Sequence, residues 1–279
     1  MPLKLMYITN RPDVARIAES AGVDRIFVDL EYIGKADRQG GMDTVQNHHT
    51  VHDVRVIKET VTTAQVLARI NPIHGATDEY CGSKEEIDAV IDAGADIVML
   101  PFFKTVGEVE TFIKLVGGRA VTLPLVETPE AVNAIDEILE LPGLDEIFIG
   151  LNDLSIGYGK KFMFELLTDG TVENLCLKFK RKAIPYGFGG IAALGKGMLP
   201  AEYIIREHYR MGSTSVILSR SFCDVNQVER IENVKPIFIH GVREIRELET
   251  ECERYSSYFR ENERTVAERI RSIVAGKNQ

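Results

Sequence analysis

The sequence lacks the features that mark secreted, membrane-spanning and zinc-stabilised proteins. It has no run of about 18 apolar residues that could cross a bilayer, and its first residues, MPLKLMYITNRPD, contain no apolar stretch like that of a signal peptide. The cysteines are scattered, with no C-x-x-C pair and no zinc-like spacing; they are Cys81, Cys176, Cys223 and Cys252. We therefore expect a cytoplasmic protein in a reducing compartment, without a membrane partner.

An excess of basic residues is also missing. The chain has 33 Lys and Arg against 42 Asp and Glu, a formal net charge of −9, which argues against nucleic acid as a partner. A local basic pocket could still bind a small anion. The hydrophobic fraction of 44% suffices for a large core, and 279 residues suit one barrel domain, which typically needs about 250.

A phosphate-binding glycine fingerprint is the third absence. The first apolar run leads into Thr9-Asn10-Arg11-Pro12 rather than G-x-G-x-x-G, which disfavours a doubly wound nucleotide-binding sheet. The chain instead repeats an apolar run, a polar junction and a segment of helical period. The apolar runs span residues 3–8, 25–30, 65–70, 97–100, 121–126, 146–151, 186–191 and 215–219. This order predicts a (β/α)8 TIM barrel over residues 1–240.

Residues 241–279 are expected to form a long helix, within the barrel domain or as an oligomerisation element. Over about residues 242–275, apolar side chains such as Ile245, Leu248 and Cys252 step by three and four along a narrow seam. This seam needs a partner surface, either the chain's own barrel or a second subunit. We expect a homo-oligomer.

Two acids follow two successive apolar runs. Residues 121–126 lead into Glu127, and residues 146–151 lead into Asn152-Asp153. Because the carboxyl ends of parallel strands meet at one face of the sheet, the two carboxylates should lie beside each other. Their oxygens suit Mg²⁺ or Mn²⁺, with other positions left to water and an oxo-acid substrate. Alternatively, Glu127 is a helix N-terminal charge and Asp153 a turn residue.

Four strand-end motifs occur in one order along the chain. They are V-D-L-E at 28–31, A-R-I-N-P at 68–72, V-E-T-P-E-A at 126–131 and I-G-L-N-D-L-S at 149–155. From about residue 3 to 224, the chain resembles the HpcH/HpaI aldolase and citrate lyase β-subunit family, metal-dependent barrels of the phosphoenolpyruvate/pyruvate type. The resemblance implies Glu127 and Asp153 as metal ligands and Arg69 as the catalytic arginine. It also implies that backbone N–H groups of Leu151 and Asn152 hold a substrate carboxylate.

The motif after the second apolar run departs from the family pattern. Class II aldolases of the family often have D-G-E-H there, with the His as acid/base, whereas this chain has Asp29-Leu30-Glu31-Tyr32. Either Tyr32 or a residue of the polar segment 33–52 takes that role, or a different step is catalysed. His48 and His49 are candidates for the acid/base, although exposed loops often carry histidines without such a role.

Three charged residues have competing interpretations. Arg69 falls where an enolate oxygen would develop its charge, and a guanidinium can stabilise that charge without donating a proton; the alternative is a salt bridge that closes the barrel mouth. Glu31 could orient Arg69 or bind a metal-bound water, and a structural role is equally consistent. Arg38 could meet a substrate carboxylate.

Together these residues predict a lyase of the class II aldolase type. A divalent ion and Arg69 would stabilise the enolate of a pyruvate- or oxaloacetate-like 2-oxo acid while a carbon–carbon bond breaks or forms. The nearest alternative is a lyase or hydrolase of acyl-CoA thioesters, as in the citrate lyase branch, which needs a basic surface for the nucleotide of coenzyme A. A barrel that binds an oxo acid without turnover is a further alternative.

Overall fold

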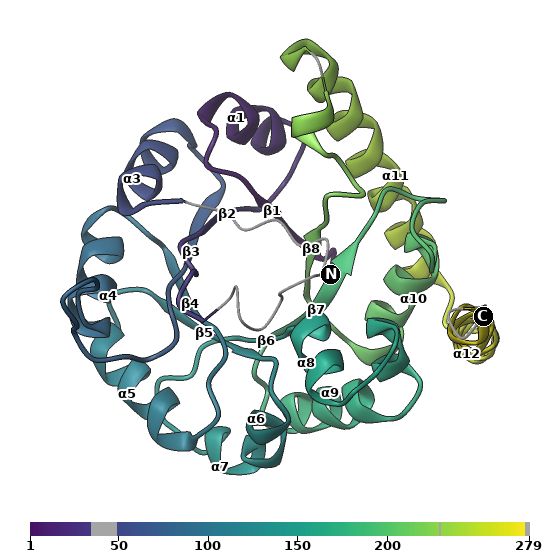
Figure 1. Ribbon diagram of the computed structural model, residues 1–279. Helices are drawn as coiled ribbons and strands as arrows, with labels where there is room; N and C mark the ends of the chain where they lie inside the picture. Colours follow the sequence, from purple (N-terminus) through teal and green to yellow (C-terminus); the bar gives the residue numbers. More distant parts are fainter. Residues whose placement is uncertain (35–48, 229, 277–279) are drawn as a thin grey trace.

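Eight parallel strands close into a barrel surrounded by helices (Figure 1). The computed structural model of the protein describes residues 1–34, 49–228 and 230–276. Each strand pairs with the next, and β8 pairs with β1. The strands are β1 Lys4–Ile8, β2 Arg25–Asp29, β3 Gln65–Arg69, β4 Ile97–Leu100, β5 Val121–Val126, β6 Ile147–Ile149, β7 Tyr186–Ile191 and β8 Ser215–Leu218. The prediction of a (β/α)8 barrel is confirmed.

The helices follow the strands in the expected alternation. They are α1 Pro12–Ser20, α3 Val51–Thr60, α4 Ser83–Asp92, α5 Val106–Val116, α6 Pro129–Asn133, α7 Ile135–Ile138, α8 Leu151–Gly157, α9 Thr171–Arg181, α10 Ala201–Met211, α11 Val234–Arg254 and α12 Phe259–Gly276, with short 3-10 helices at Met163–Leu167, Val225–Gln227 and Ile231–Asn233. Thr50 and Thr105 begin α3 and α5 with reciprocal capping boxes to Asp53 and Glu108. None of the helices in the described ranges is long and apolar enough to span a bilayer.

The strands bury both of their faces. Alternate residues point into the barrel and form a small inner core that includes Met6, Phe27, Leu67, Met99 and Leu125. The intervening residues face outward and form the larger core between the strands and the helices. This double burial explains why the strands occur in the sequence as continuous apolar runs.

At the amino-terminal end of the strands, a buried ion pair lies inside the barrel. Arg25 of β2 donates two hydrogen bonds to Glu146, at 2.8 and 2.6 Å. The Arg25 side chain is 1% exposed and that of Glu146 is 12% exposed, and Lys4 adds a second ion pair to Glu146 at 3.3 Å. The buried carboxylate of Glu146 thus has two cationic partners at this end.

Several helix boundaries differ from the sequence prediction. The apolar run at 146–151 continues past the strand, which ends at Ile149, because Leu151 is already the first residue of α8. Two segments where the sequence pattern indicates one helix each are also divided. Residues 129–139 contain the short helices α6 and α7, and residues 162–182 contain a 3-10 turn followed by α9.

The C-terminal region contains a long helix, as predicted, but the helical seam over residues 242–275 is not continuous. Helix α11 begins at Val234 and ends at Arg254, because Tyr255 takes an extended conformation. Helix α12 then packs against α10 of the same barrel: Asn262 donates hydrogen bonds to Tyr203 O at 3.1 Å and to Glu207 Oε1 at 2.7 Å, and Val266 and Ile270 are buried. Much of the apolar seam is therefore buried against the chain's own barrel. The homo-oligomer stays a prediction.

Candidate active site

Glu127 is positioned by strand β5 and by two backbone features around it. It continues the inward alternation of Leu123 and Leu125, so its carboxyl group lies at the carboxyl-terminal mouth of the barrel. The N–H of Phe102 donates to Glu127 Oε1 at 2.9 Å. Gly150 leaves room for the other oxygen, because a Cβ there would stand 2.7 Å from Glu127 Oε2.

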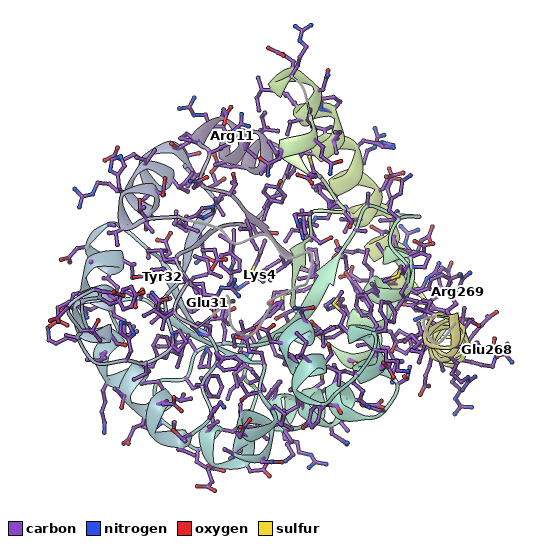
Figure 2. The ribbon with its side chains drawn as sticks, viewed as in Figure 1. Lys4, Arg11, Glu31, Tyr32, Glu268 and Arg269 are labelled. Carbon is purple, nitrogen blue, oxygen red and sulfur yellow. The ribbon has the colours of Figure 1, made fainter. Side chains whose placement is uncertain are left out.

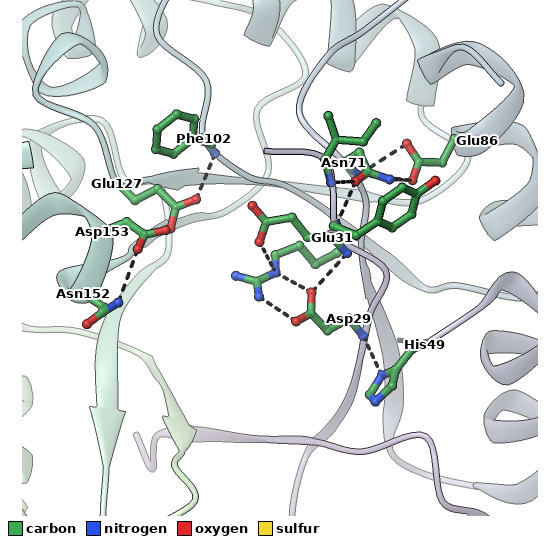
Figure 3. Close-up of polar contacts among 12 residues, drawn as sticks. Asp29, Glu31, His49, Asn71, Glu86, Phe102, Glu127, Asn152 and Asp153 are labelled. Atoms are coloured by element: carbon green, nitrogen blue, oxygen red, sulfur yellow. Dashed lines mark hydrogen bonds and ion pairs between the residues drawn. The ribbon is translucent and has the colours of Figure 1, made fainter. Parts of the chain in front are cut away.

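Asp153 reaches the same place from α8. It lies in the first turn of this helix, directly after β6, and Asn152 donates a 3.3 Å hydrogen bond to its Oδ1. In Figure 3 the carboxyl groups of Glu127 and Asp153 lie side by side, and that of Glu31 points toward them. The structure therefore brings the two predicted metal ligands together, while their metal role stays a prediction.

The charges around Glu127 fit a divalent cation. Glu127 is 4% exposed. Burial, then the negative charges of Glu31 and Asp153, raise the pKa of its carboxyl well above the usual glutamate range, against the opposing effect of Arg69. A cation bound by Glu127 and Asp153 would offset this uncompensated charge. No group of three or more His, Cys, Asp or Glu side chains at metal-ligand distances occurs within the described ranges, so water and substrate would have to supply the remaining ligands.

Arg69 at the end of β3 is held by two acids from β2. It donates to Asp29 through Nε and Nη2, at 2.8 Å each, and its Nε lies 3.3 Å from Glu31 Oε2. Burial disfavours its charge, but Asp29 and Glu31 outweigh this effect and raise the pKa of the guanidinium. The planar group is thus permanently charged and fixed by a bidentate contact.

Asp29 is the site residue that the sequence prediction missed. Glu31, predicted to orient Arg69 or bind a metal-bound water, does contact Arg69, but Asp29 makes the bidentate contact. Asp29 and Arg69 are Cα partners in the β2–β3 register, so their side chains leave the sheet together. The signal was available: with a period of two, Asp29 and Glu31 share the inward face that Phe27 begins.

His49 is the candidate acid/base that the structure brings to the site. Its Nδ1 accepts a hydrogen bond from the Asp29 N–H at 3.0 Å, which places the proton of a neutral ring on Nε2. His48 and Arg38 lie outside the described residues. Tyr32 is 46% exposed and packs on the Tyr80 ring; Figure 2 shows Glu31 near the middle of the barrel and Tyr32 farther out.

Leu151 and Asn152 are the first two residues of α8, and the first N–H groups of a helix have no acceptor within that helix. They immediately precede Asp153, so an anion bound there would adjoin a cation held by the two acids. Their role in holding a substrate carboxylate stays a prediction.

Two cavities flank these groups at the barrel mouth. One, of about 380 Å³, lies between β1 and β8, and it is lined by Asp29, His49 and Arg69 together with polar residues that include Arg11 and Arg220. The other, of about 340 Å³, is lined by Glu127 and Asp153 and by Phe102, Pro129 and Ile156. Arg69 and His49 thus share the polar cavity.

A (β/α)8 barrel whose acids and arginine gather at the carboxyl ends of its strands has the architecture of a barrel enzyme. The model of the HpcH/HpaI aldolase/citrate lyase family matches residues 4–165, and the chain belongs to this family. The resemblance found in the strand-end motifs is therefore confirmed. Named members of the family include aldolases and CoA thioesterases.

Characterised relatives show the range of the family. The chain is 27% identical over 165 residues to a (3S)-malyl-CoA thioesterase of Cereibacter sphaeroides, covering 57% of this chain and 52% of that protein. It is 24% identical over 176 residues to a 2-keto-3-deoxy-L-rhamnonate aldolase of Escherichia coli, covering 52% and 58%. The match thus spans less than two thirds of either relative.

Solved structures support the fold over more of the chain. An HpcH/HpaI aldolase from Desulfitobacterium hafniense superposes with a TM-score of 0.59 at 16% identity, covering 88% of this chain and 93% of that one. The citrate synthase SbnG gives a TM-score of 0.56 at 17% identity, covering 78% and 87%. The common barrel therefore extends beyond the segment that the family model matches.

Proposed function

We propose that this protein is a carbon–carbon lyase of the class II aldolase type that depends on Mg²⁺ or Mn²⁺. Its substrate would be a pyruvate- or oxaloacetate-like 2-oxo acid. The main observation in its support is that Arg69 and the acids Glu127 and Asp153 lie close together at one barrel mouth. Family membership supports it, because named relatives include a 2-keto-3-deoxy acid aldolase.

Glu127 and Asp153 would hold the cation, which supplies a Lewis acid that polarises the ketone of a 2-oxo acid. The N–H groups of Leu151 and Asn152 would bind the substrate carboxylate beside it. Arg69 would face the ketone oxygen, where negative charge grows as the electron pair of the broken carbon–carbon bond moves into the enolate. Because Asp29 and Glu31 already fix the guanidinium, little reorganisation is needed at that moment.

His49 would position the substrate's 4-hydroxyl. Its Nδ1 accepts from the Asp29 N–H, so the proton of the neutral ring is on Nε2, which would donate a hydrogen bond to the hydroxyl oxygen. In the cleavage direction the hydroxyl proton would pass to water as that carbon becomes an aldehyde. In the reverse direction water would return a proton to the new alkoxide.

Two assays test the proposal. Purified protein with Mg²⁺ or Mn²⁺ should release pyruvate from a 4-hydroxy-2-oxo acid, and in D₂O it should exchange the C3 protons of pyruvate. Arg69→Ala should lower both rates on the order of 10³-fold, the upper range for losing one oxyanion-stabilising donor. Undiminished rates in this variant would remove Arg69 from the mechanism. Tight oxo-acid binding without turnover across a broad panel would instead favour a binding barrel.

A second candidate is a lyase or hydrolase of acyl-CoA thioesters. The 27% identity to a malyl-CoA thioesterase favours it. Arg220 and Arg11, which also pairs with Asp13 at 2.6 Å, line the β1–β8 cavity, where they would meet an acyl-CoA phosphate. Free coenzyme A distinguishes the two functions. Competition by coenzyme A against pyruvate proton exchange would favour the thioester enzyme, and no competition would favour the aldolase.

A further inference from the structure

A buried acid on α4 lies outside the set of residues that would touch the substrate. Glu86 is 7% exposed. Both of its oxygens accept from the backbone N–H of Asn71, at 3.2 and 3.3 Å, and Oε1 also accepts from Asn71 Nδ2 at 2.7 Å (Figure 3). Burial raises the pKa of this carboxyl, and the hydrogen bonds from Asn71 oppose that rise. Glu86 therefore fixes the amide of Asn71 in one orientation.

The other side of the Asn71 amide faces the chain that leaves β2. Its Oδ1 accepts from the N–H of Tyr32 at 3.0 Å and from the N–H of Ile33 at 2.9 Å. Asn71 is 1% exposed and stands two residues after Arg69. One side-chain amide thus ties α4, through Glu86, to the two residues that follow Glu31.

This tie determines where Glu31 can lie. The Glu31 N–H donates to Asp29 Oδ1 at 3.3 Å, and the same oxygen accepts from Arg69 Nε at 2.8 Å. With the N–H groups of residues 32 and 33 held by Asn71, the backbone on both sides of Glu31 is fixed, and its Oε2 lies 3.3 Å from Arg69 Nε. The contact to the guanidinium is therefore set by residues that do not touch it.

Asparagine is well suited to this position. The side chain must accept from two backbone N–H groups with one atom and donate to a carboxylate with the other. Aspartate would provide the acceptor but would place two carboxyl groups together, and alanine would provide neither group. Glu86 is the matching acceptor, because its carboxylate takes the hydrogen bonds that the Asn71 side chain and backbone donate.

We propose that Asn71 and Glu86 are positioning residues for Arg69, acting through the turn at residues 31–33 and through Glu31. The role in turnover rests on the proposed lyase function, because it concerns the orientation of Arg69 toward a developing enolate. The competing explanation is that the pair merely anchors the β3–α4 connection and stabilises the barrel.

The first test is a double-variant cycle on pyruvate proton exchange in D₂O. Asn71→Ala should lower kcat by roughly 10- to 100-fold, since misplacement of an active-site group by about 1 Å can cost about 100-fold. The KM for pyruvate and the Kd for Mn²⁺ should change less than about two-fold. Added to Arg69→Ala, the same substitution should cause no further loss. An equal loss in both backgrounds would overturn the proposal.

A matched control separates positioning from stability. Glu249 is also a buried acid, 2% exposed, and accepts from a backbone N–H, that of Leu3, at 2.7 Å, but it lies at the opposite end of the barrel. Glu249→Gln should lower the melting temperature as Asn71→Ala does, and leave kcat unchanged. Matching losses of kcat in the two variants would show a stability effect and contradict the proposal.

An exchange of the two groups should rescue activity. Asn71→Asp alone should lower kcat because it sets a carboxylate against Glu86. Asn71→Asp combined with Glu86→Gln should restore most of kcat, because the new amide donates to the new carboxylate and the acceptor for the Tyr32 and Ile33 N–H groups remains. Failure of the double variant to recover, while its melting temperature does recover, would contradict the proposed role.

A measurement on the metal-free protein does not depend on activity. In protein labelled with ¹⁵N-arginine, the Arg69 Nε–H, assigned from its loss in Arg69→Ala, should exchange with solvent at least about ten-fold faster in Asn71→Ala than in Glu249→Gln. Equal exchange in the two would overturn the positioning role. If the wild type exchanges no pyruvate protons with either metal, the proposed lyase function fails, and this measurement alone decides the role of Asn71.

Discussion

The two ends of the barrel interior both contain buried charges, but only one end is balanced. At the amino-terminal end, Glu146 meets Arg25 and Lys4. Burial opposes its ionisation, but the hydrogen bond and charge of Arg25 outweigh this and lower the pKa of Glu146. At the carboxyl-terminal mouth, burial and the charges of Glu31 and Asp153 raise the pKa of Glu127, and Arg69 does not outweigh them. The balanced end stabilises the fold, and the unbalanced end has charge left for a ligand.

The largest change in stability is expected from removing Arg25, the buried partner of Glu146. Arg25→Met leaves Glu146 buried with only the partly exposed Lys4, so the free energy of unfolding should fall by about 3–5 kcal/mol. The melting temperature should then drop on the order of 10 °C. Pairing the change with Glu146→Met should recover much of the loss, because no buried charge remains unpaired. Denaturant unfolding measures both variants, and equal destabilisation in the single and double variants would contradict the argument.

At the carboxyl-terminal mouth, we expect removal of a charge to raise the melting temperature, by a smaller amount. Glu127→Gln keeps the shape of the side chain and removes a repelled charge, so the metal-free protein should melt a few degrees higher. The same change should weaken Mn²⁺ binding by about 2 kcal/mol or more, roughly 30-fold. Calorimetric titration and thermal melts check both statements. A lower melting temperature without metal would show that the acids at the mouth are already balanced.

The smallest effect concerns pH. The folded-state pKa of Glu146 lies below its unfolded value. Its contribution to stability is therefore present above the ordinary glutamate pKa and is lost as pH falls from there through the lowered folded-state pKa. The difference in unfolding free energy between the wild type and Glu146→Gln should therefore shrink below about pH 4. Urea unfolding at a series of pH values measures it. A difference that stayed constant down to pH 3 would contradict the lowered pKa.

Much of the barrel could be predicted from sequence, because strands buried on both faces are continuous apolar runs. The same signal misplaced the end of β6, because Leu151 belongs to the apolar run by composition, yet it begins α8. The break of the last helix at Tyr255 was also missed, since apolar spacing continues across it; beyond the break, α12 packs on α10.

The site residues that follow strands could be predicted from sequence, whereas the contacts between different strands and helices could not. Glu127, Asp153 and Arg69 occur in motifs that end strands, and the structure brings them to one mouth. The period of two places Asp29 on the inward face, but its pairing with Arg69 depends on the register of two strands together. The link from Glu86 to Asn71 joins α4 to a residue 15 positions earlier, so no strand or helix period shows it.

The seam where β8 meets β1 has a consequence for synthesis. The first strand finds its second neighbour only at residues 215–218, and Glu249 of α11 accepts the N–H of Leu3. While the ribosome is still adding the intervening chain, β1 keeps one edge open, and such an edge can pair with other nascent chains. Chaperone demand should therefore last until the eighth strand has emerged, whatever the stability of the finished protein.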